Sequence, residues 1–250
     1  MPLLTLERRG AGPPLAWLHG FTQTRSSARQ FRTILTGRHE VMTLDLPGHG
    51  DAASISASLP EIAALVLDAL PDEPFALGGY SFGGRVALHV ALHAPARLTA
   101  LVVLGASRGI ADHDERAQRL ARDEALASHL EDVGTEQFLR EWLAQPLFAR
   151  LGPRSEPESR SLDARGLADS LRRAGTGTQE WLGPRLADLA VPTLALAGAA
   201  DVKFTKEARA IADTVADGHF ATILDAGHAA HLEQPERTAE VIEGFLDARS

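Results

Sequence analysis

A serine at the centre of a glycine-rich motif restricts the fold more than any other part of the chain. The motif Gly79-Tyr80-Ser81-Phe82-Gly83 follows an apolar run, Phe75–Leu77, and precedes a helix-like run, Val86–Leu92. Glycine allows a strand to turn sharply into a helix, and such a turn holds the serine in a strained backbone conformation with its hydroxyl exposed. Glycine-rich strand ends also occur for packing alone, so this G-x-S-x-G sequence predicts a reactive serine only if partner residues follow.

Two later segments supply candidate partners for the serine. Asp201 follows the apolar run Val191–Gly198, and His228 follows another such run, Phe220–Leu224. The order serine, acid, histidine is that of α/β-hydrolases, in which histidine takes the serine proton and the acid orients the histidine. Asp225 is an alternative acid, but it lies on the His228 loop itself, so we interpret it as a turn residue.

Short apolar runs alternate with helical patterns along most of the chain. The runs are continuous, as in strands that are covered on both faces. They are Leu15–Leu18, Val41–Leu46, Phe75–Leu77, Leu98–Leu104, Thr193–Ala197 and Phe220–Leu224. A helical pattern from Ile62 to Leu70 stops at Pro71, and a C-terminal one begins at Pro235, a residue suited to the first helical turn. This alternation predicts a mostly parallel, doubly wound sheet.

The strand pattern is interrupted between about residues 108 and 189. This segment contains a short amphipathic helix, Phe138–Leu143, ended by Pro146, and many charged residues that we expect to pair on a solvated face. We therefore expect one α/β-hydrolase domain, with a core formed by residues 1–107 and 190–250. Residues 108–189 would be a helical cap over the serine, inserted after the sixth strand.

Composition excludes several classes of protein. With 250 residues, of which 44% are hydrophobic, the chain can bury one sizeable core. A net charge of −8 argues against nucleic acid or anionic membranes as partners. There is no cysteine, and His228 and His231 lack nearby acid or cysteine ligands, so we expect no metal and no cofactor. The first nine residues lack a signal-peptide pattern, and a cytoplasmic protein is expected. The oligomeric state cannot be inferred.

Two loops are expected to lie beside the serine. His19-Gly20-Phe21 follows the run Leu15–Leu18, where this fold takes its second oxyanion-hole donor. The backbone N–H groups of Phe21 and Phe82 would then bind a developing oxyanion. The segment Asp45–Gly50 follows the next run and suits a tight loop, in which we expect His49 to be structural.

A wider set of motifs resembles one subfamily, the MenH family of 2-succinyl-6-hydroxy-2,4-cyclohexadiene-1-carboxylate synthases of menaquinone biosynthesis. The resemblance spans most of the chain, and the expected cap discriminates best because caps differ sharply between subfamilies. The matching segments are Gly79–Arg85, Glu115–Arg119, Glu141–Phe148, Gly166–Arg172, Gly175–Gln179 and Asp201–Phe204.

The resemblance implies a carbon–oxygen lyase that eliminates pyruvate from a succinyl-cyclohexene dicarboxylate precursor. It implies the catalytic residues Ser81, Asp201 and His228, and the substrate-binding residues Tyr80, Arg85, Arg119, Trp142 and Arg160. The family often has asparagines after the last of these arginines, where this chain has Ser161-Leu162-Asp163.

The chemistry of these residue types fits a small polycarboxylate substrate. Guanidinium groups bind carboxylates bidentately and stay charged in a closed site. Ser81, deprotonated by His228, can act as a base or as a nucleophile, and both roles need the same residues. A hydrolase acting on an ester, lactone or carbon–carbon bond of an acidic small molecule therefore remains an alternative. A non-catalytic ligand-binding protein is disfavoured, because the Ser81, Asp201 and His228 set is complete.

Overall fold

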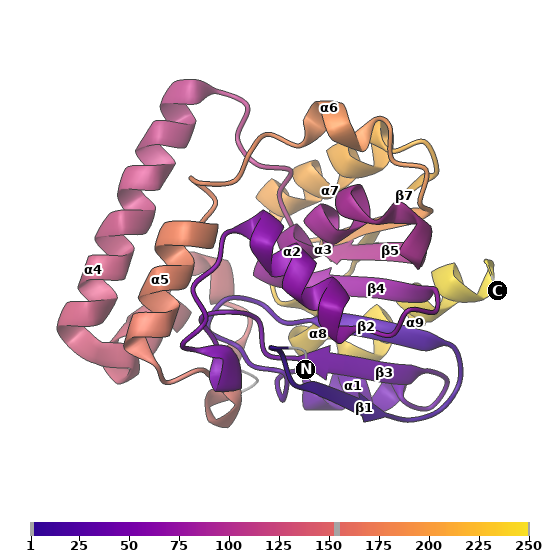
Figure 1. Cartoon of the computed structure of the whole chain (residues 1–250), viewed down its shortest axis with the longest axis horizontal. Helices are drawn as coiled ribbons and strands as arrows, with labels where there is room; N and C mark the ends of the chain where they lie inside the picture. The colour runs from indigo at the N-terminus through magenta and orange to yellow at the C-terminus, as the bar shows by residue number, and fades with distance from the viewer. Residues whose placement is uncertain (1–2, 153–155, 250) are drawn as a thin grey trace.

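A seven-stranded sheet organises the chain. The computed structural model describes residues 3–152 and 156–249. Its strand order is β1-β3-β2-β4-β5-β6-β7, in which β1 pairs antiparallel with β3 and the other neighbouring strands are parallel. Parallel neighbours require crossover connections, which the intervening helices supply (Figure 1). The mostly parallel, doubly wound sheet predicted from the sequence is confirmed.

The bounds of the elements follow the sequence pattern closely in the core. The strands are β1 (Leu6–Arg9), β2 (Pro14–Leu18), β3 (Glu40–Leu44), β4 (Phe75–Tyr80), β5 (Leu98–Leu104), β6 (Thr193–Gly198) and β7 (Gly218–Ile223). The α-helices are α1 (Arg29–Leu35), α2 (Leu59–Ala69), α3 (Phe82–His93), α4 (His113–Leu143), α5 (Ala164–Ala174), α6 (Gly183–Leu186), α7 (Val202–Thr214), α8 (Ala230–Glu233) and α9 (Pro235–Asp247). Short 3-10 turns are η1 (Gly50–Ala52), η2 (Pro95–Arg97), η3 (Pro146–Phe148) and η5 (Pro157–Ser159).

Helices cover both faces of the sheet, which explains the continuous apolar strands. Adjacent residues of β5 point to opposite faces, so Leu101 belongs to one buried cluster and Val102 to the other. The first cluster is completed by α2, α3 and α7, for example through Ile62 and Ile211. The second is completed by α1, α8 and α9, for example through Phe31. Both faces are therefore buried, as parallel sheets require.

The strand β1 has no counterpart in the sequence prediction. Its residues, Leu6 to Arg9, are half-buried or exposed at the edge of the sheet. Its conformation comes from pairing with β3. The chain before β2 forms this single strand within the described residues, so the insertion that follows β5 comes after the fifth strand. The prediction that the helical insertion follows the sixth strand was therefore wrong by one strand.

Helices fill the interval between β5 and β6. The long helix α4 and the shorter α5 pack against each other to one side of the sheet (Figure 1), around a small apolar cluster that includes Leu130, Phe138 and Leu167. The sequence predicted only the last turns of α4. The helix in fact begins at His113 and is interrupted at Gly134, where φ is 75°. Its first part is mostly charged and buries few side chains, so its apolar periodicity is weak.

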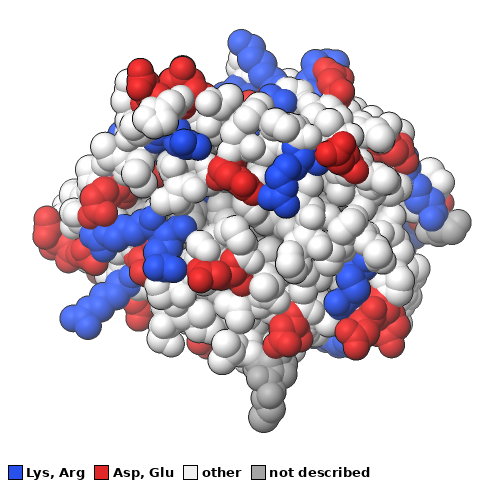
Figure 2. Space-filling model, turned by 45° about the horizontal axis from the view of Figure 1, so that its top comes forward, with Lys and Arg blue, Asp and Glu red and all other residues white. Residues whose placement is uncertain are grey.

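Surface charges are mixed in sign. On the face shown in Figure 2, basic and acidic side chains lie interspersed. On the outer helices they form exposed ion pairs, such as Arg172 with Glu124 and Glu131, and Arg140 with Glu136. Exposed pairs of this kind contribute about 0–1 kcal/mol each to stability. Among the helices of the described ranges, none combines the length and apolar character needed to cross a membrane.

Candidate active site

Ser81 stands at a strained turn between β4 and α3. Its backbone has φ 52° and ψ −106°, a region that side-chain-bearing residues rarely occupy. A side chain at Gly79 would collide with the carbonyl of Gly83, and one at Gly83 with the carbonyl of Leu18. The two glycines of the motif are therefore required because α3 packs directly on the ends of β4 and β2. This geometry exposes the Ser81 hydroxyl at the strand end.

His228 and Asp201 complete a hydrogen-bonded chain with Ser81. His228 Nε2 lies 3.1 Å from Ser81 Oγ, and His228 Nδ1 lies 2.7 Å from Asp201 Oδ2. His228 is 3% exposed and Asp201 8% exposed, so their hydrogen bond is shielded from water. Asp201 also caps α7, because its Oδ1 accepts the N–H of Phe204 at 3.2 Å. The carboxylate is thus fixed by a helix start on one side and by the imidazole on the other.

Asp225, the alternative acid, forms no hydrogen bond with His228 in the described part of the chain. Asp225 is exposed in the left-handed region, with φ 59°, on the turn that precedes His228. The loop is held instead by Glu233, a buried carboxylate that accepts the N–H of Gly227 at 2.6 Å and of Ala229 at 3.2 Å. Glu233 was not predicted from the sequence, because nothing in its spacing distinguishes it from a surface residue of a helix.

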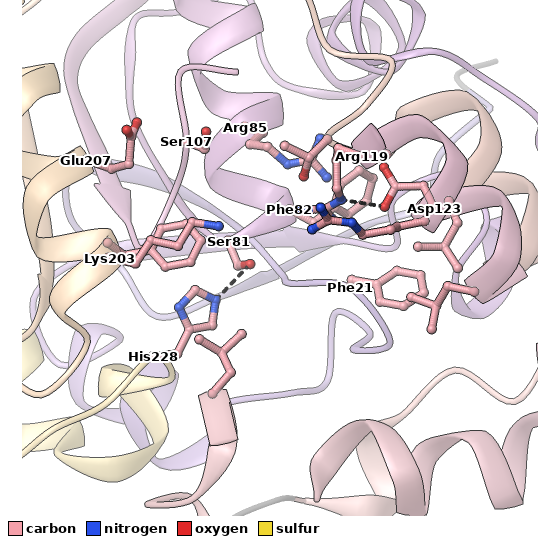
Figure 3. Close-up of a pocket in the computed structure, with 18 of the residues that line it drawn as sticks. Phe21, Ser81, Phe82, Arg85, Ser107, Arg119, Asp123, Lys203, Glu207 and His228 are labelled. Atoms are coloured by element: carbon pink, nitrogen blue, oxygen red, sulfur yellow. Dashed lines mark hydrogen bonds and ion pairs between the residues drawn. The ribbon is translucent and has the colours of Figure 1, made fainter. Parts of the chain in front are cut away.

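The two residues predicted to donate to an oxyanion both lie near Ser81 in the structure. Phe82 is the first residue of α3, so its N–H belongs to the helix turn that has no intrahelical acceptor. Phe21 lines the same cavity as Ser81, from the loop after β2 (Figure 3). Both residues line the cavity that contains Ser81, as the predicted oxyanion hole requires.

Buried neutral histidines support the Phe21 loop. His19 Nε2 accepts the N–H of Leu46 at 3.0 Å, which leaves its Nδ1 to donate to Gly20 O at 2.9 Å. His49 lies between the rings of Phe21 and Phe82. Burial lowers the pKa of His19 to about 4 and that of His49 to about 3. Both imidazoles therefore stay uncharged at neutral pH, and the structural role expected for His49 fits its contacts.

A cavity of about 950 Å³ opens above Ser81. Part of its wall is aromatic: Trp142 packs on Phe21 and on Phe148, at ring-centroid distances of 5.3 and 5.8 Å. Tyr80 is buried beside His228 and also lines the cavity. Burial raises the pKa of the Tyr80 phenol, so this group stays protonated. The cavity thus combines apolar walls with a few polar groups, as small-molecule sites do.

Two guanidinium groups face the cavity between α3 and α4. Arg85, on the elbow helix, and Arg119, on α4, lie on the same side of the pocket (Figure 3). Arg119 Nε donates to Asp123 Oδ1 at 2.7 Å. Burial and the nearby charge of Arg119 lower the pKa of Arg85 to about 10, so Arg85 remains a cation at neutral pH. This end of the cavity is suited to anions.

Arg160, which lies between η5 and α5 in the inserted segment, also lines the cavity. Its Nη1 donates to Thr22 Oγ1 at 2.8 Å, and its backbone forms an isolated bridge with Gln23. The next residue, Ser161, donates its N–H to Thr22 O at 2.8 Å, and Ser159 O accepts the hydroxyl of Ser27 at 2.8 Å. The segment 159–161 is therefore joined to the loop that carries Phe21.

The structure brings all the sequence-predicted site residues into one place. Ser81, Phe21, Phe82, Tyr80, Arg85, Arg119, Trp142, Arg160 and His228 line the cavity, and Asp201 lies directly behind the imidazole. Lys203 also lines the cavity but was not singled out as a site residue. Within the described ranges no group of histidine and acidic side chains could hold a metal ion.

Comparisons with known proteins identify the family to which this chain belongs. A model of the "Alpha/beta hydrolase family" matches residues 15–241. The chain belongs to the alpha/beta hydrolase family.

A narrower relationship follows from individual relatives. The chain is 35% identical to the 2-succinyl-6-hydroxy-2,4-cyclohexadiene-1-carboxylate synthase of Serratia proteamaculans, over 94% of this chain and 93% of that protein. It is 32% identical to the synthase of the same name from Photorhabdus laumondii, over 94% and 85% of the two chains. The structure of MenH from S. aureus superposes with a TM-score of 0.90 at 30% identity, covering 100% of this chain and 99% of that chain. The resemblance to the MenH family is therefore confirmed.

A hydrolase is also among the structural neighbours. A thermophilic esterase from Thermogutta terrifontis, solved with malate bound, superposes with a TM-score of 0.80 at 25% identity. The superposition covers 99% of this chain and 94% of the esterase chain.

Proposed function

We propose that this protein is a carbon–oxygen lyase that eliminates pyruvate from a succinyl-cyclohexene dicarboxylate precursor in menaquinone biosynthesis. The product would be 2-succinyl-6-hydroxy-2,4-cyclohexadiene-1-carboxylate, the compound named in its relatives. The observation that carries the proposal is the pairing, in one cavity, of the Ser81–His228–Asp201 chain with the guanidinium groups of Arg85 and Arg119.

The name of the product indicates where a base must act. A double bond begins at the ring carbon that carries the succinyl group, so the proton on that carbon is lost. The neighbouring ketone makes this proton acidic, because the electron pair can delocalise onto the carbonyl oxygen. We propose that His228 takes the proton of Ser81 and that Ser81 Oγ removes the proton from carbon. Asp201 would stabilise the imidazolium that forms.

The remaining steps balance the elimination. The electron pair moves through the ring and breaks the carbon–oxygen bond to the leaving group, which departs as the enolate of pyruvate. The proton gained by His228 returns to that leaving group, and the free enzyme is restored. During proton removal the N–H groups of Phe21 and Phe82 would stabilise the enolate-like oxygen, and donors of this kind each contribute about 10²–10³ in rate in related sites.

The guanidinium groups would bind the carboxylates of the substrate. A planar fork holds a carboxylate by two parallel hydrogen bonds, which fixes orientation as well as charge. Arg85 and Arg119 would bind one carboxylate, and Arg160 a second at the other wall of the cavity. Tyr80 and Trp142 would pack against the ring. We further propose that residues 108–189 act as the cap that encloses this substrate.

The test is pyruvate release from the synthetic precursor. Lactate dehydrogenase and NADH convert pyruvate production into a loss of absorbance, and the diene product can be followed independently. Ser81→Ala serves as the control for non-enzymatic elimination. Absence of pyruvate release by the folded wild-type protein, at precursor concentrations up to the millimolar range, would refute the proposal.

A hydrolase of an acidic ester, lactone or carbon–carbon bond is the second candidate. The malate-bound esterase favours it, because that protein has the same fold. A hydrolase needs Ser81 as nucleophile and forms an acyl-serine, which a lyase does not. Hydrolysis of p-nitrophenyl acetate alone does not separate the two, since an activated serine can cleave such an ester in either case.

A further inference from the structure

The guanidinium group of Arg85 is held by neutral acceptors. Its Nη1 donates to Ala174 O at 2.8 Å and to Gln179 Oε1 at 3.4 Å. Arg85 is 9% exposed, and within the described part of the chain no carboxylate forms an ion pair with it. A buried cation normally has such a partner, so its positive charge is left for something that enters the cavity.

The orientation of the Gln179 amide is fixed from both sides. Gln179 is 2% exposed, and its Nε2 donates to Ser107 O at 3.1 Å. A backbone carbonyl can only accept, so the amide NH₂ must face Ser107 and the amide oxygen must face Arg85. The side chain does not belong to the cavity wall formed by the described residues. Gln179 therefore contacts the guanidinium from behind.

The loop after α5, which carries Gln179, also helps to fix the guanidinium group of Arg119. Asp123, 2% exposed, accepts Arg119 Nε with one oxygen and the N–H of Gly177 with the other, at 2.7 and 2.9 Å. Ala174, Gly177 and Gln179 thus connect Arg85 on α3 with Arg119 on α4. Figure 3 shows both guanidinium groups beside Asp123. Asp123 pairs with Arg119 alone, so the positive charge of Arg85 is left without a carboxylate partner among the described residues.

We propose, building on the proposed function, that Gln179 is a positioning residue that aims Arg85 at a substrate carboxylate while leaving its charge free. An amide accepts a hydrogen bond from a guanidinium but does not neutralise it. A carboxylate at the same position would form an internal ion pair and compete with the substrate. The neutral side chain at position 179 is thus as important as its hydrogen bond.

Two substitutions separate the hydrogen bond from the charge. Gln179→Glu keeps the shape and adds a negative charge next to Arg85, and the guanidinium keeps that carboxyl ionised. Gln179→Met keeps the length but removes the acceptor. We expect Gln179→Glu to raise KM for the precursor by more than about tenfold, because the new carboxylate competes with the substrate for Arg85. Gln179→Met should raise KM by a smaller factor, because it only removes a hydrogen bond to a charged group. Because the triad is untouched, kcat should stay within about threefold.

Gln145→Glu is the matched control. Gln145 lies in the cavity wall near Trp142, so this change adds the same charge to the cavity at a different place. It should raise KM by a smaller factor than Gln179→Glu. Circular dichroism and thermal melting would establish that each variant is folded. Equal effects of the two glutamate variants, or a loss confined to kcat, would overturn the positioning role.

A binding measurement keeps this inference separate from the lyase reaction. Succinate, a simple dicarboxylate, is titrated calorimetrically into the wild-type protein and into each variant. We expect Gln179→Glu to weaken its binding by about tenfold or more, whether or not pyruvate is released from the precursor. Unchanged succinate affinity in Gln179→Glu, or no succinate binding by the wild-type protein, would overturn the inference. Missing pyruvate release with the expected loss of succinate affinity would reject only the proposed function.

Discussion

Mild acid should unfold this protein, because it buries four uncharged histidines. His19, His49, His89 and His231 are each at most 5% exposed. Burial is the main reason that their pKa values fall from 6.5 to about 4, 3, 4 and 3 respectively. In the unfolded chain the same imidazoles regain a pKa near 6.5. Below that pH the unfolded state binds protons that the folded state does not, so stability falls as pH falls.

When the pH lies above the histidine pKa values of the folded protein, the loss of unfolding free energy depends only on the histidine pKa in the unfolded chain. At pH 5 each histidine is protonated in the unfolded chain and largely neutral in the folded one, which costs about 2 kcal/mol per histidine. From pH 7 to pH 5 the four together lower the free energy of unfolding by about 7 kcal/mol. That loss is comparable to the whole stability of a typical domain, about 5–15 kcal/mol.

Urea unfolding followed by circular dichroism measures this effect. The free energy of unfolding should change by about 5 kcal/mol per pH unit between pH 6 and pH 5, which corresponds to about four protons taken up on unfolding. His89→Leu should reduce that number by one, because His89 is buried in α3 and its Nε2 has no hydrogen-bond partner in the described structure. The slope of the denaturant dependence serves as the control for two-state behaviour.

A small pH effect would refute this reasoning. If the free energy of unfolding changes by less than about 2 kcal/mol between pH 7 and pH 5, at most one histidine behaves as described. An unchanged slope in His89→Leu would likewise show that the buried imidazole is not a source of the acid sensitivity.

Three further predictions concern the reaction. We expect a fall in kcat for pyruvate release of about 10³-fold or more in each of Ser81→Ala, His228→Ala and Asp201→Asn. Double variants should be little worse than the worst single one, because the three residues act as one unit. Asp225→Asn should reduce kcat much less. Arg119→Lys should weaken transition-state binding by about 1.5–3 kcal/mol, seen as a fall in kcat/KM, because a point charge cannot replace a planar fork. Intact-mass spectrometry of enzyme quenched during turnover should show no adduct on Ser81, since the serine acts as a base.

Each of these has a clear contrary result. Multiplicative losses in the double variants would show that the three residues act independently, and a severe Asp225 variant would mean that the wrong acid was chosen. Wild-type kinetics in the Arg119→Lys enzyme would remove that residue from the substrate site. A mass shift mapped to Ser81 with the true precursor would move this protein to the hydrolases.

The central sheet and the serine site were predictable because local sequence encodes them directly. Strands buried on both faces need continuous apolar residues, so Leu98–Leu104 could be delimited to the residue. The glycines around Ser81 reflect the close contact of α3 with the sheet, which no other residue permits. Asp201 and His228 could be located because each follows a recognisable strand. Their hydrogen bonds with Ser81 required the structure.

Elements whose conformation depends on distant partners were missed or truncated. The strand Leu6–Arg9 has no apolar run, because it owes its conformation to β3 at the sheet edge. Most of α4 was overlooked, since its exposed, charged turns lack a clear periodicity. Asp123 and Gln179 resemble surface residues in sequence, and only their burial against the two arginines reveals their role. Polar residues carry no local sign of whether they become buried.

If residues 108–189 enclose the substrate and Phe21 binds the oxyanion, as proposed, the hydrogen bonds between residues 159–161 and the Phe21 loop make these two tasks mechanically dependent on each other. Arg160 and Ser161 are bonded to Thr22, the residue directly after Phe21. A shift of this corner of the insertion therefore also shifts the Phe21 N–H group relative to Ser81. A substrate carboxylate that draws Arg160 inward would tighten the oxyanion hole in the same movement, so a smaller acid that does not reach Arg160 would meet a less well-formed catalytic centre.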